Sequence, residues 1–440
     1  MMIFLETLGC SRNQVDSEIM LGKLAAGGHT LTPDPALAEV IIVNTCGFIS
    51  TASDEAVDVI LEMAEYKKTG ACKRLIATGC LAQRYKDDPD LTATLPEVDA
   101  FLGTAACERI VEAVESREAL TLFPDPDQRA FQDMSEQREL LSDHFAYVKV
   151  SEGCNRHCTY CIIPKLRGTQ RSRPVADIVG ESERLVDQGV KEIILTAENT
   201  TDYGRDLKDG TGFDQVLSGL ASALDNKNAW IRFLYTHPET LTEQLIRTVK
   251  GHKNIASYYD VPVQHASSRI LKKMGRPYTV EDLYTLFETI KWIDPEAALR
   301  TTLIVGFPGE TEEDFKILMK FIRDIRFDHL GVFTYSDSED LSSHRLKDHV
   351  PSEIAEIRHD RIMEAQAKIS LVINEGHVGK IFEVLVEENP EPGVYIGRTR
   401  FQAPEVDGVT FIYADGLEIG TFVKVRITDA FEYDIAGELA

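Results

Sequence analysis

Three cysteines in one short loop constrain this chain more than any other feature of its sequence. Cys154, Cys158 and Cys161 form a C-x3-C-x2-C array in the stretch EGCNRHCTYCIIPKLRGTQRSR. Thiolates this close together, with Gly153 ahead of them, can enclose a single inorganic centre. A closed zinc site takes four ligands, usually from two C-x2-C pairs or from C-x2-C with two histidines, and the array matches neither pattern. Three thiolates on a four-iron cluster would leave one iron open to an outside ligand.

The neighbouring His157 is an alternative fourth ligand. It lies between Cys154 and Cys158 in the sequence, which favours a position in solvent or behind the ligands. A second alternative is a loop whose thiols are only structural. With Tyr160 directly before its last cysteine, the array resembles the signature of the radical S-adenosylmethionine (SAM) enzymes. That resemblance implies that the open iron binds the amino and carboxylate groups of SAM.

The first hundred residues repeat one pattern. IFLETLGC, VIIVNTC and RLIATGC are β-type runs that each end in a cysteine, and helix-like stretches follow over 12–26, over 50–68 and from 81. Strand–helix units in series predict a parallel α/β sheet. Ligands of such sheets bind at the carboxyl ends of the strands.

Cys10, Cys46 and Cys80 all lie at these strand ends, 36 and 34 residues apart. The pattern therefore predicts that they meet at one edge of the sheet, as a second triad of metal ligands with one open position. The alternative is three buried core cysteines, since free cysteine is commonly buried. Core cysteines are expected inside strands, however. Cys72 and Cys107 lack the shared position, and we interpret them as core residues.

From residue 145 onward, strand-like runs alternate with amphipathic stretches such as 176–188 and 281–293. The runs are AYVKV, EIILTAEN, WIRFLYTHPE, YYDVPVQHAS, LRTTLIVGFPGE and HLGVFTYSDS. Six such repeats predict a partial, (β/α)6 TIM-type barrel, in which the chemistry lies in the loops after the strands. The cysteine loop follows the first of these runs, where this rule expects it.

The radical SAM resemblance also implies which strand ends hold the cofactor. LTAEN, VPVQHAS and GFPGE supply the matching residues, and Arg167, Arg171 and Arg173 form a basic run that could pair with the SAM carboxylate or an anionic cluster. The alternative for this run is a solvated surface. The residues implied as SAM contacts are Tyr160, Glu198, Asn199, Gln264, His265, Gly306, Gly309 and Arg173.

From about residue 377 the pattern changes to short strands with turns, which predicts a small five-stranded barrel of OB type. Its position resembles that of the TRAM domain, which in relatives binds RNA. Residues 377–440 hold 12 Asp and Glu against 5 Lys and Arg, a net charge of −7. Phosphate binding favours the opposite sign.

The predicted domains are an N-terminal α/β domain over 1–115, a radical SAM core over 140–373 and a TRAM-like barrel over 374–440, with a polar, turn-rich connection over 111–143. The 440 residues carry a net charge of −25, which suits a basic protein partner better than free nucleic acid. We expect neither a membrane span nor a signal peptide. Eight cysteines without export then indicate a reducing compartment, the cytoplasm.

Two cysteine triads, an α/β domain, a radical SAM barrel and a TRAM-like tail, in this order, resemble the methylthiotransferase family over essentially the whole chain. One branch of that family modifies an adenosine in tRNA, and another modifies an aspartate side chain of the small-subunit ribosomal protein at the decoding centre. LGCSRNQVDSE, LTAENTTDYG, VQHASSRILKKMGR and DAFEYDIAGE favour the second branch. The acidic tail agrees, because ribosomal proteins are basic. In LRGTQRSRP, Gln170 stands where the tRNA branch typically has a glutamate.

The resemblance implies two [4Fe-4S] clusters, SAM and a low-potential electron donor. The barrel cluster would reduce SAM to methionine and a 5′-deoxyadenosyl radical, which suits a C–H bond that side-chain bases do not deprotonate. The N-terminal cluster would hold the sulfur that is methylated and transferred. Three alternatives remain: a tRNA adenosine methylthiotransferase, a non-enzymatic cluster carrier and a zinc-stabilised RNA-binding module.

Overall fold

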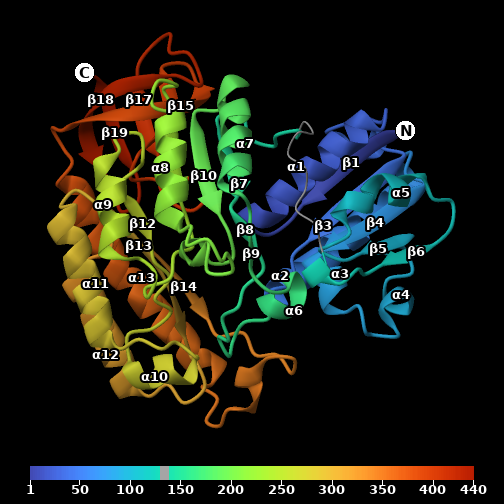
Figure 1. The fold of residues 1–440 in the computed structure, drawn as a ribbon, viewed down its shortest axis with the longest axis horizontal. Coiled ribbons are helices and arrows are strands. Elements are labelled where there is room, and N and C mark those ends of the chain that lie inside the picture. The colour runs from blue at the N-terminus through green and yellow to red at the C-terminus, as the bar shows by residue number, and fades with distance from the viewer. Residues whose placement is uncertain (129–137) are drawn as a thin grey trace.

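The computed structural model describes residues 1–128 and 138–440, and Figure 1 shows three parts. A parallel α/β domain is followed by a half-barrel of parallel strands with helices outside it, and the chain ends in a small closed β-barrel. The fold class predicted from the sequence is confirmed in each part.

The N-terminal domain is a six-stranded parallel sheet with helices on both faces. Its elements are β1 (Met2–Thr7), α1 (Ser11–Ala26), β2 (Thr30–Leu31), β3 (Val40–Thr45), α2 (Ser50–Thr69), β4 (Arg74–Gly79), α3 (Cys80–Arg84), α4 (Leu91–Thr94), β5 (Ala100–Leu102), α5 (Ile110–Glu115) and β6 (Leu120–Leu122). The strand order is β2-β1-β3-β4-β5-β6. Alternate residues of β3 serve the two faces: Ile41 and Val43 pack with α2, whereas Val40 and Ile42 pack with α1 and α5. Burial on both faces explains why these strands are apolar throughout.

Two details of this domain differ from the sequence-based prediction. The segment 111–143 is predicted to be a connection, but it contains most of α5 and the strand β6, which pairs with β5 and extends the sheet beyond residue 115. β6 is only three residues long, so its sequence signal is weak. The helix predicted from residue 81 begins at Cys80 and is a single short turn, since α3 ends at Arg84.

The half-barrel has six parallel strands. They are β7 (Phe145–Lys149), β10 (Glu192–Thr196), β11 (Trp230–Phe233), β12 (Tyr258–Asp260), β13 (Ala298–Val305) and β14 (His329–Thr334), and a parallel bridge between Ile231 and Ile255 joins its two halves. The helices packed outside are α7 (Val175–Asp187), α8 (Phe213–Ala223), α9 (Glu243–Gly251), α11 (Val280–Ile293), α12 (Glu312–Ile325) and α13 (Ser352–Glu375). Capping boxes fix the starts of α11 and α12, where Thr279 and Thr311 pair with the acidic residue three positions on. Short elements at the strand ends are β8 (Ser151–Glu152), α6 (Ile163–Arg167), β9 (Arg171–Ser172) and α10 (Ser268–Lys273).

The long helix α13 links the half-barrel to the C-terminal barrel. The apolar stripe along α13 is interrupted, because polar residues such as Gln366 and Ser370 are buried on its inner side. There the side chain of Gln366 donates to the carbonyl of Phe327 (2.7 Å). The closed barrel follows in the order β15-β16-β17-β19-β18. Its strands are β15 (Ile381–Glu391), β16 (Val394–Thr399), β17 (Thr410–Tyr413), β18 (Phe422–Ala430) and β19 (Ile435–Leu439).

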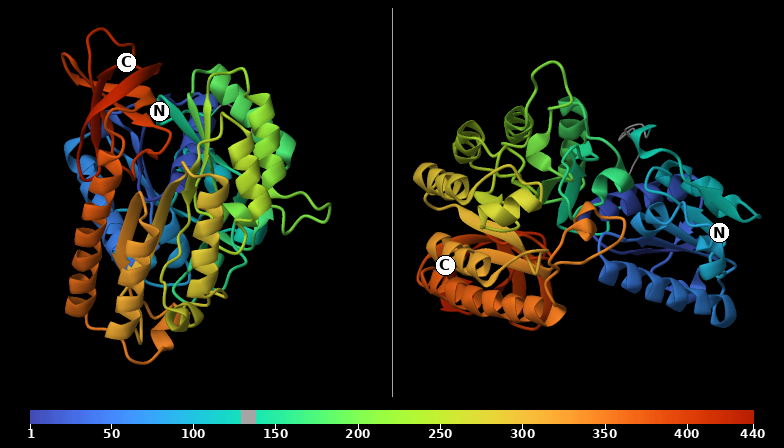
Figure 2. Two further views of the ribbon diagram at one scale, coloured as in Figure 1. Left: turned by 90° about the vertical axis from the view of Figure 1, so that its left-hand side faces the viewer. Right: turned by 90° about the horizontal axis from the view of Figure 1, so that it is seen from below.

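Both end domains pack against the half-barrel, and in Figures 1 and 2 the C-terminal barrel lies at the amino ends of its strands. Val15 and Ile19 of α1 form a hydrophobic cluster with inward-facing residues of the half-barrel, among them Tyr147 and Ile194. From the other side, the loop between β16 and β17 enters the same cluster through Ala403. The space inside the half-barrel is therefore bounded by all three domains.

Candidate functional site

The three cysteines of the barrel loop lie just beyond the carboxyl end of β7, between β8 and α6. Gly153 has a φ of +76°, and a Cβ there would lie 2.1 Å from the carbonyl oxygen of Thr169, so the turn requires glycine. Cys154 is fixed by its N–H, which donates to the carbonyl of Gly168 (3.0 Å). Burial raises the pKa of Cys154 to about 11, and the nearby Cys158 adds to that rise. The pKa of Cys161 is raised in the same way, by burial first and then by Cys158 and Cys154.

The other triad is assembled at the carboxyl edge of the N-terminal sheet. Cys10 precedes the first residue of α1, Cys46 follows β3, and Cys80 is the first residue of α3. The chain reverses its direction of winding between β1 and β3, and α/β sheets bind ligands at such a switch point. The loops that carry Cys10 and Cys46 approach each other closely, since a Cβ on Gly9 would lie 2.9 Å from the Cβ of Cys46. Burial raises the pKa of Cys80 to about 12, and Cys10 and Cys46 add to the rise.

Both triads lie near one carboxylate. Glu198, after β10, forms ion pairs with Arg12 (3.1 Å) and with Arg167 (3.8 Å) and is almost fully buried. Its charge contributes to the raised pKa values of Cys80 in the N-terminal domain and of Cys154 and Cys161 in the barrel loop. Glu198 therefore lies near both sets, where it pairs with one arginine of α1 and one of the cysteine-loop segment.

Arg167 connects the domains directly. Its guanidinium donates to Asp16 of α1 (2.8 Å), to Asn13 of α1 (2.5 Å) and to Glu152 (3.0 Å), and it reaches the Sγ of Cys80 at 3.8 Å. The side chain of Arg167 is 2% exposed, so these ion pairs are shielded from water. The sequence suggests that the basic run could pair with SAM or a cluster. In the structure Arg167 contacts three carboxylates, of Asp16, Glu152 and Glu198, as well as an amide and a thiol of the protein itself. Sequence reasoning missed Asp16 and Asn13, because no local motif joins α1 to a loop about 150 residues away.

The predicted SAM contacts occupy the loops after the strands. The hydroxyl of Tyr160 accepts from Arg276 (2.7 Å), and Asn199 donates to Asp202 (2.7 Å). Gln264 has a left-handed backbone with φ +67°, and its carbonyl accepts from Ile304 N–H (2.7 Å). Their roles toward SAM stay predictions.

The glycine-rich loop 306–310 is held by its own last residue. The carboxylate of Glu310 accepts from the N–H groups of Gly306 (2.7 Å) and Phe307 (3.2 Å) and pairs with Arg358 of α13 (2.9 Å). Burial raises the pKa of Glu310 to about 7. Gly309 also has a left-handed backbone, with φ +82°, and a Cβ there would meet the amine of Lys273.

Four other residues of the cysteine-loop segment have different surroundings. Arg173 is buried and donates to Glu181 (2.7 Å) and to the carbonyl of Lys149 (2.7 Å), so the structure gives it partners in the barrel wall. Arg171 donates to the carbonyl of Pro126 (2.8 Å). Gln170 is buried and its amide donates to the carbonyl of Asp202 (2.6 Å), a contact that a carboxylate could make only when protonated. His157 is exposed.

The interpretation of Cys72 and Cys107 as core residues is confirmed. Cys72 is buried in the cluster between the sheet and α2, and its thiol donates to the carbonyl of Arg74 (3.4 Å). Cys107 is buried in the cluster on the opposite face of the sheet.

The donor sets of both triads fit iron–sulfur clusters. Thiolates are the usual ligands of these clusters, and Arg12 and Arg167 supply positive charge beside the thiols.

Among residues 1–128 and 138–440, no three His, Cys, Asp or Glu side chains are arranged to hold a single metal ion. The same residues include no helix that is long and apolar enough to cross a membrane.

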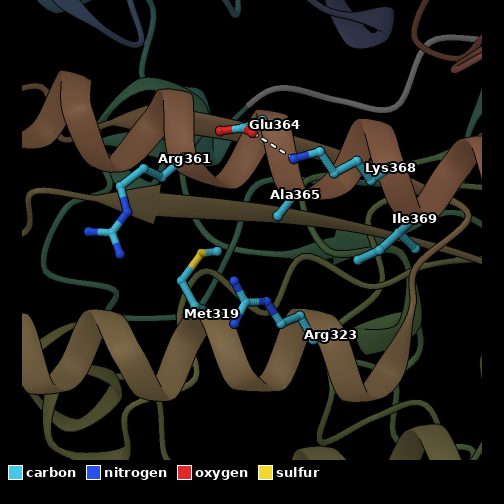
Figure 3. Close-up of a pocket in the computed structure, with 7 residues that line it drawn as sticks. All are labelled: Met319, Arg323, Arg361, Glu364, Ala365, Lys368 and Ile369. Atoms are coloured by element: carbon cyan, nitrogen blue, oxygen red, sulfur yellow. Dashed lines mark hydrogen bonds and ion pairs between the residues drawn. The ribbon is translucent and has the colours of Figure 1, made fainter.

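A cavity of about 520 Å³ opens beside Cys10. Its walls come from all three domains: Cys10 and Gln14 from the first, Asp260 and Arg300 from the half-barrel, and Glu405 from the C-terminal barrel. A second pocket, between α12 and α13, is shown in Figure 3. It is lined by Met319, Arg323, Arg361, Glu364, Ala365, Lys368 and Ile369 and includes no residue of either triad. The first cavity is therefore the candidate binding site for a substrate.

Comparison with family models divides the chain into three matches. Residues 2–103 match the uncharacterized protein family UPF0004, residues 148–322 match the radical SAM superfamily, and residues 378–440 match the TRAM domain. These matches follow the three structural parts in the same order.

Comparison with whole proteins gives relatives of the same length. The chain is 50% identical to ribosomal protein uS12 methylthiotransferase RimO of Desulfosudis oleivorans, over 100% of both chains. It is 46% identical to the protein of the same name from Clostridioides difficile, over 99% of this chain and 98% of that one. Among solved structures, the radical SAM methyltransferase TsrM from Kitasatospora setae aligns with a TM-score of 0.54 at 13% identity, over 90% of this chain and 78% of that chain. That likeness concerns the fold alone.

Proposed function

Because the chain belongs to the family of the ribosomal protein uS12 methylthiotransferases, and so is a radical SAM enzyme, we propose that it transfers a methylthio group to an aspartate side chain of ribosomal protein uS12. The observation that carries the proposal is the match at 50% identity over the full length of a protein with that name. The site supports it, since two cysteine triads lie near one buried carboxylate and a cavity opens beside Cys10.

Radical SAM enzymes bind SAM at a [4Fe-4S] cluster, and we assign this cluster to Cys154, Cys158 and Cys161. The second cluster, on Cys10, Cys46 and Cys80, is part of the proposal. When bound, the cofactors supply the radical that removes hydrogen from an unactivated carbon and the sulfur that replaces it.

The protein's own residues provide position and seclusion. Arg167 and Glu198 tie the loop of one triad to the loop of the other, which fixes the separation of the two centres. Both side chains are almost fully buried, so their ion pairs are shielded from water. A reactive radical requires such seclusion, because solvent would otherwise compete with the substrate.

The proposed partners follow from charge and chemistry. The acidic tail, with its net charge of −7, favours a basic protein over nucleic acid. A low-potential electron donor must reduce the barrel cluster. We place the reaction in the cytoplasm, and we retain the domain limits 1–115, 140–373 and 374–440 as a proposal, with the sheet of the first domain continuing to Leu122.

The test offers the reconstituted enzyme two substrates under reducing, anaerobic conditions. One is purified uS12 or the small ribosomal subunit, and the other is undermodified tRNA. Mass spectrometry should find one added methylthio group on an aspartate of uS12 and none on the tRNA. Transfer to the tRNA alone would replace this proposal with tRNA adenosine methylthiolation.

A further inference from the structure

The lining of the cavity beside Cys10 has more acidic than basic side chains. Its ionisable lining consists of Cys10, Asp260, Arg300, Glu405 and the phenols of Tyr147 and Tyr235. Arg300 is shared, since it pairs with Asp260 (3.2 Å) and with Asp407 (3.3 Å), which lies behind the wall. The guanidinium of Arg300 therefore already pairs with two carboxylates, and neither of them is that of Glu405.

Glu405 has no cationic partner among the described residues. Its carboxylate accepts from the hydroxyl of Tyr147 (2.8 Å), and the residue is exposed and lines the cavity. The adjacent Val406 is 51% exposed and lines the same cavity. An unpaired carboxylate next to an exposed apolar side chain is suited to a long basic side chain, whose stem is apolar and whose head is charged.

The loop that carries Glu405 is held rigidly against the half-barrel. Asp407 accepts from the hydroxyl of Tyr258 (2.6 Å) and from the N–H of Ala403 (2.8 Å), while Arg232 donates to the carbonyl of Gln402 (3.1 Å). Glu405 itself has a left-handed backbone with φ +67°, a conformation that is uncommon for residues other than glycine. Strain of this kind persists only where the surroundings impose it, and it marks functional positions more often than other sites.

We propose that Glu405 is a specificity-determining residue, which binds a Lys or Arg side chain that lies close to the modified residue of the protein substrate. This inference rests on the proposed function, since it names how that substrate is recognised. The cavity wall thus gives the C-terminal barrel a direct part in the site, because Glu405 and Cys10 line the same cavity.

The experiment measures methylthio transfer to purified uS12 at varied concentrations of uS12 and, separately, of SAM. Glu405→Gln should raise the KM for uS12 about tenfold, as expected for the loss of one partly buried ion pair, and Glu405→Lys should raise it further. The KM for SAM should not change. Glu418→Lys is the matched control: it makes the same charge change on an exposed loop of the same domain, so it measures the effect of the net charge of the domain alone. It should raise the KM for uS12 far less than Glu405→Lys and leave the KM for SAM unchanged. Iron content and circular dichroism establish that each variant is folded and loaded.

A charge exchange gives the sharper readout. Each Lys or Arg within a few residues of the modified site of uS12 is replaced by Glu in turn, and the uS12 variants are offered to the wild-type enzyme and to Glu405→Lys. One of them should be a poor substrate for the wild type and a better one for Glu405→Lys. The inference is overturned if Glu405→Lys leaves the KM for uS12 unchanged, or if it raises the KM for SAM instead, which would assign the carboxylate to the cofactor. Failure of the wild-type enzyme to modify uS12 at all would instead contradict the proposed function.

Discussion

The Nη2 atom of Arg167 lies 3.8 Å from the Sγ atom of Cys80, so a side chain of the barrel loop contacts a proposed ligand of the other triad. The same guanidinium pairs with Asp16 and Glu152 at 2.8 and 3.0 Å, away from water. Removing one partner of a buried ion pair leaves the other charge uncompensated, which costs about 3–5 kcal/mol.

Arg167→Gln should therefore destabilise the protein by about 3 kcal/mol and weaken iron retention by the N-terminal triad more than by the barrel triad. Arg167→Lys keeps the charge but loses the fork geometry and should have a smaller effect on both. Anaerobic denaturant unfolding and iron release to a chelator measure the two quantities. Arg109→Gln, which breaks an exposed pair with Glu112, is the control and should change stability by less than about 1 kcal/mol. Equal effects of the two Gln substitutions would contradict the bridging role of Arg167.

The second prediction concerns the number of clusters. Because two separate triads of thiols are present, anaerobic reconstitution should load about eight irons per chain, in two four-iron clusters. Replacing Cys10, Cys46 and Cys80 with alanine should halve the iron content, whereas replacing Cys72 and Cys107 should leave it unchanged, since both are core residues. A full iron load in the N-terminal triple variant would show that the second cluster does not exist as proposed.

The third prediction separates the roles of the triads. The C-x3-C-x2-C spacing belongs to the barrel loop alone among the cysteines of this sequence, so Cys158→Ala should abolish reductive cleavage of SAM. Cys46→Ala should retain 5′-deoxyadenosine formation and lose the methylthiolated product. Chromatography of the reaction mixtures measures both products. Equal loss of SAM cleavage in the two variants would argue against this division of labour.

The sequence predicted the arrangement of the strands because each signal was local. IFLETLGC, VIIVNTC and RLIATGC each place an apolar run directly before a cysteine, and parallel order then brings Cys10, Cys46 and Cys80 to one edge. Amphipathic periodicity predicted α7 and α11 to within one residue at each end. α13 was missed because buried Gln366 and Ser370 interrupt its apolar stripe.

The contacts between domains could not be predicted in this way. Arg167 pairs with Asp16, and Tyr147 with Glu405, across sequence separations of 151 and 258 residues. Charged residues carry no periodic signal, and whether one is buried depends on how the domains meet. The same reasoning explains why the partner of Arg173 was not predicted. The motif resemblance implies that Arg173 contacts SAM, whereas in the structure it pairs with Glu181.

The fourth prediction concerns the acidic tail. Glu387 pairs with Arg398, which is almost fully buried, so it belongs to the structure of the domain. Glu388 and Glu391 are exposed on β15. Replacing both with Lys should slow association with basic uS12 several-fold at low salt, and the difference should shrink as salt screens the charges. Stopped-flow association at 50 and 300 mM salt would measure this. A rate independent of these charges at low salt would remove the tail from substrate recognition.

The last prediction links a buried histidine to the dependence of stability on pH. His265 is fully buried beside the glycine-rich loop, and its Nδ1 accepts from the N–H of Ser267 (2.8 Å). Burial lowers the pKa of His265 to about 3, so the folded protein keeps it neutral while the unfolded chain binds a proton below about pH 6.5. Stability is therefore lost as the pH falls from about 6.5 toward 3, by about 1.4 kcal/mol at pH 5.5 for this residue.

His265→Asn keeps an acceptor for Ser267 and removes the titration. The stability of the variant, measured by denaturant unfolding, should fall by about 1.4 kcal/mol less than that of the wild type between pH 7.5 and 5.5. Parallel losses in the two proteins would show that His265 is not held neutral by its burial.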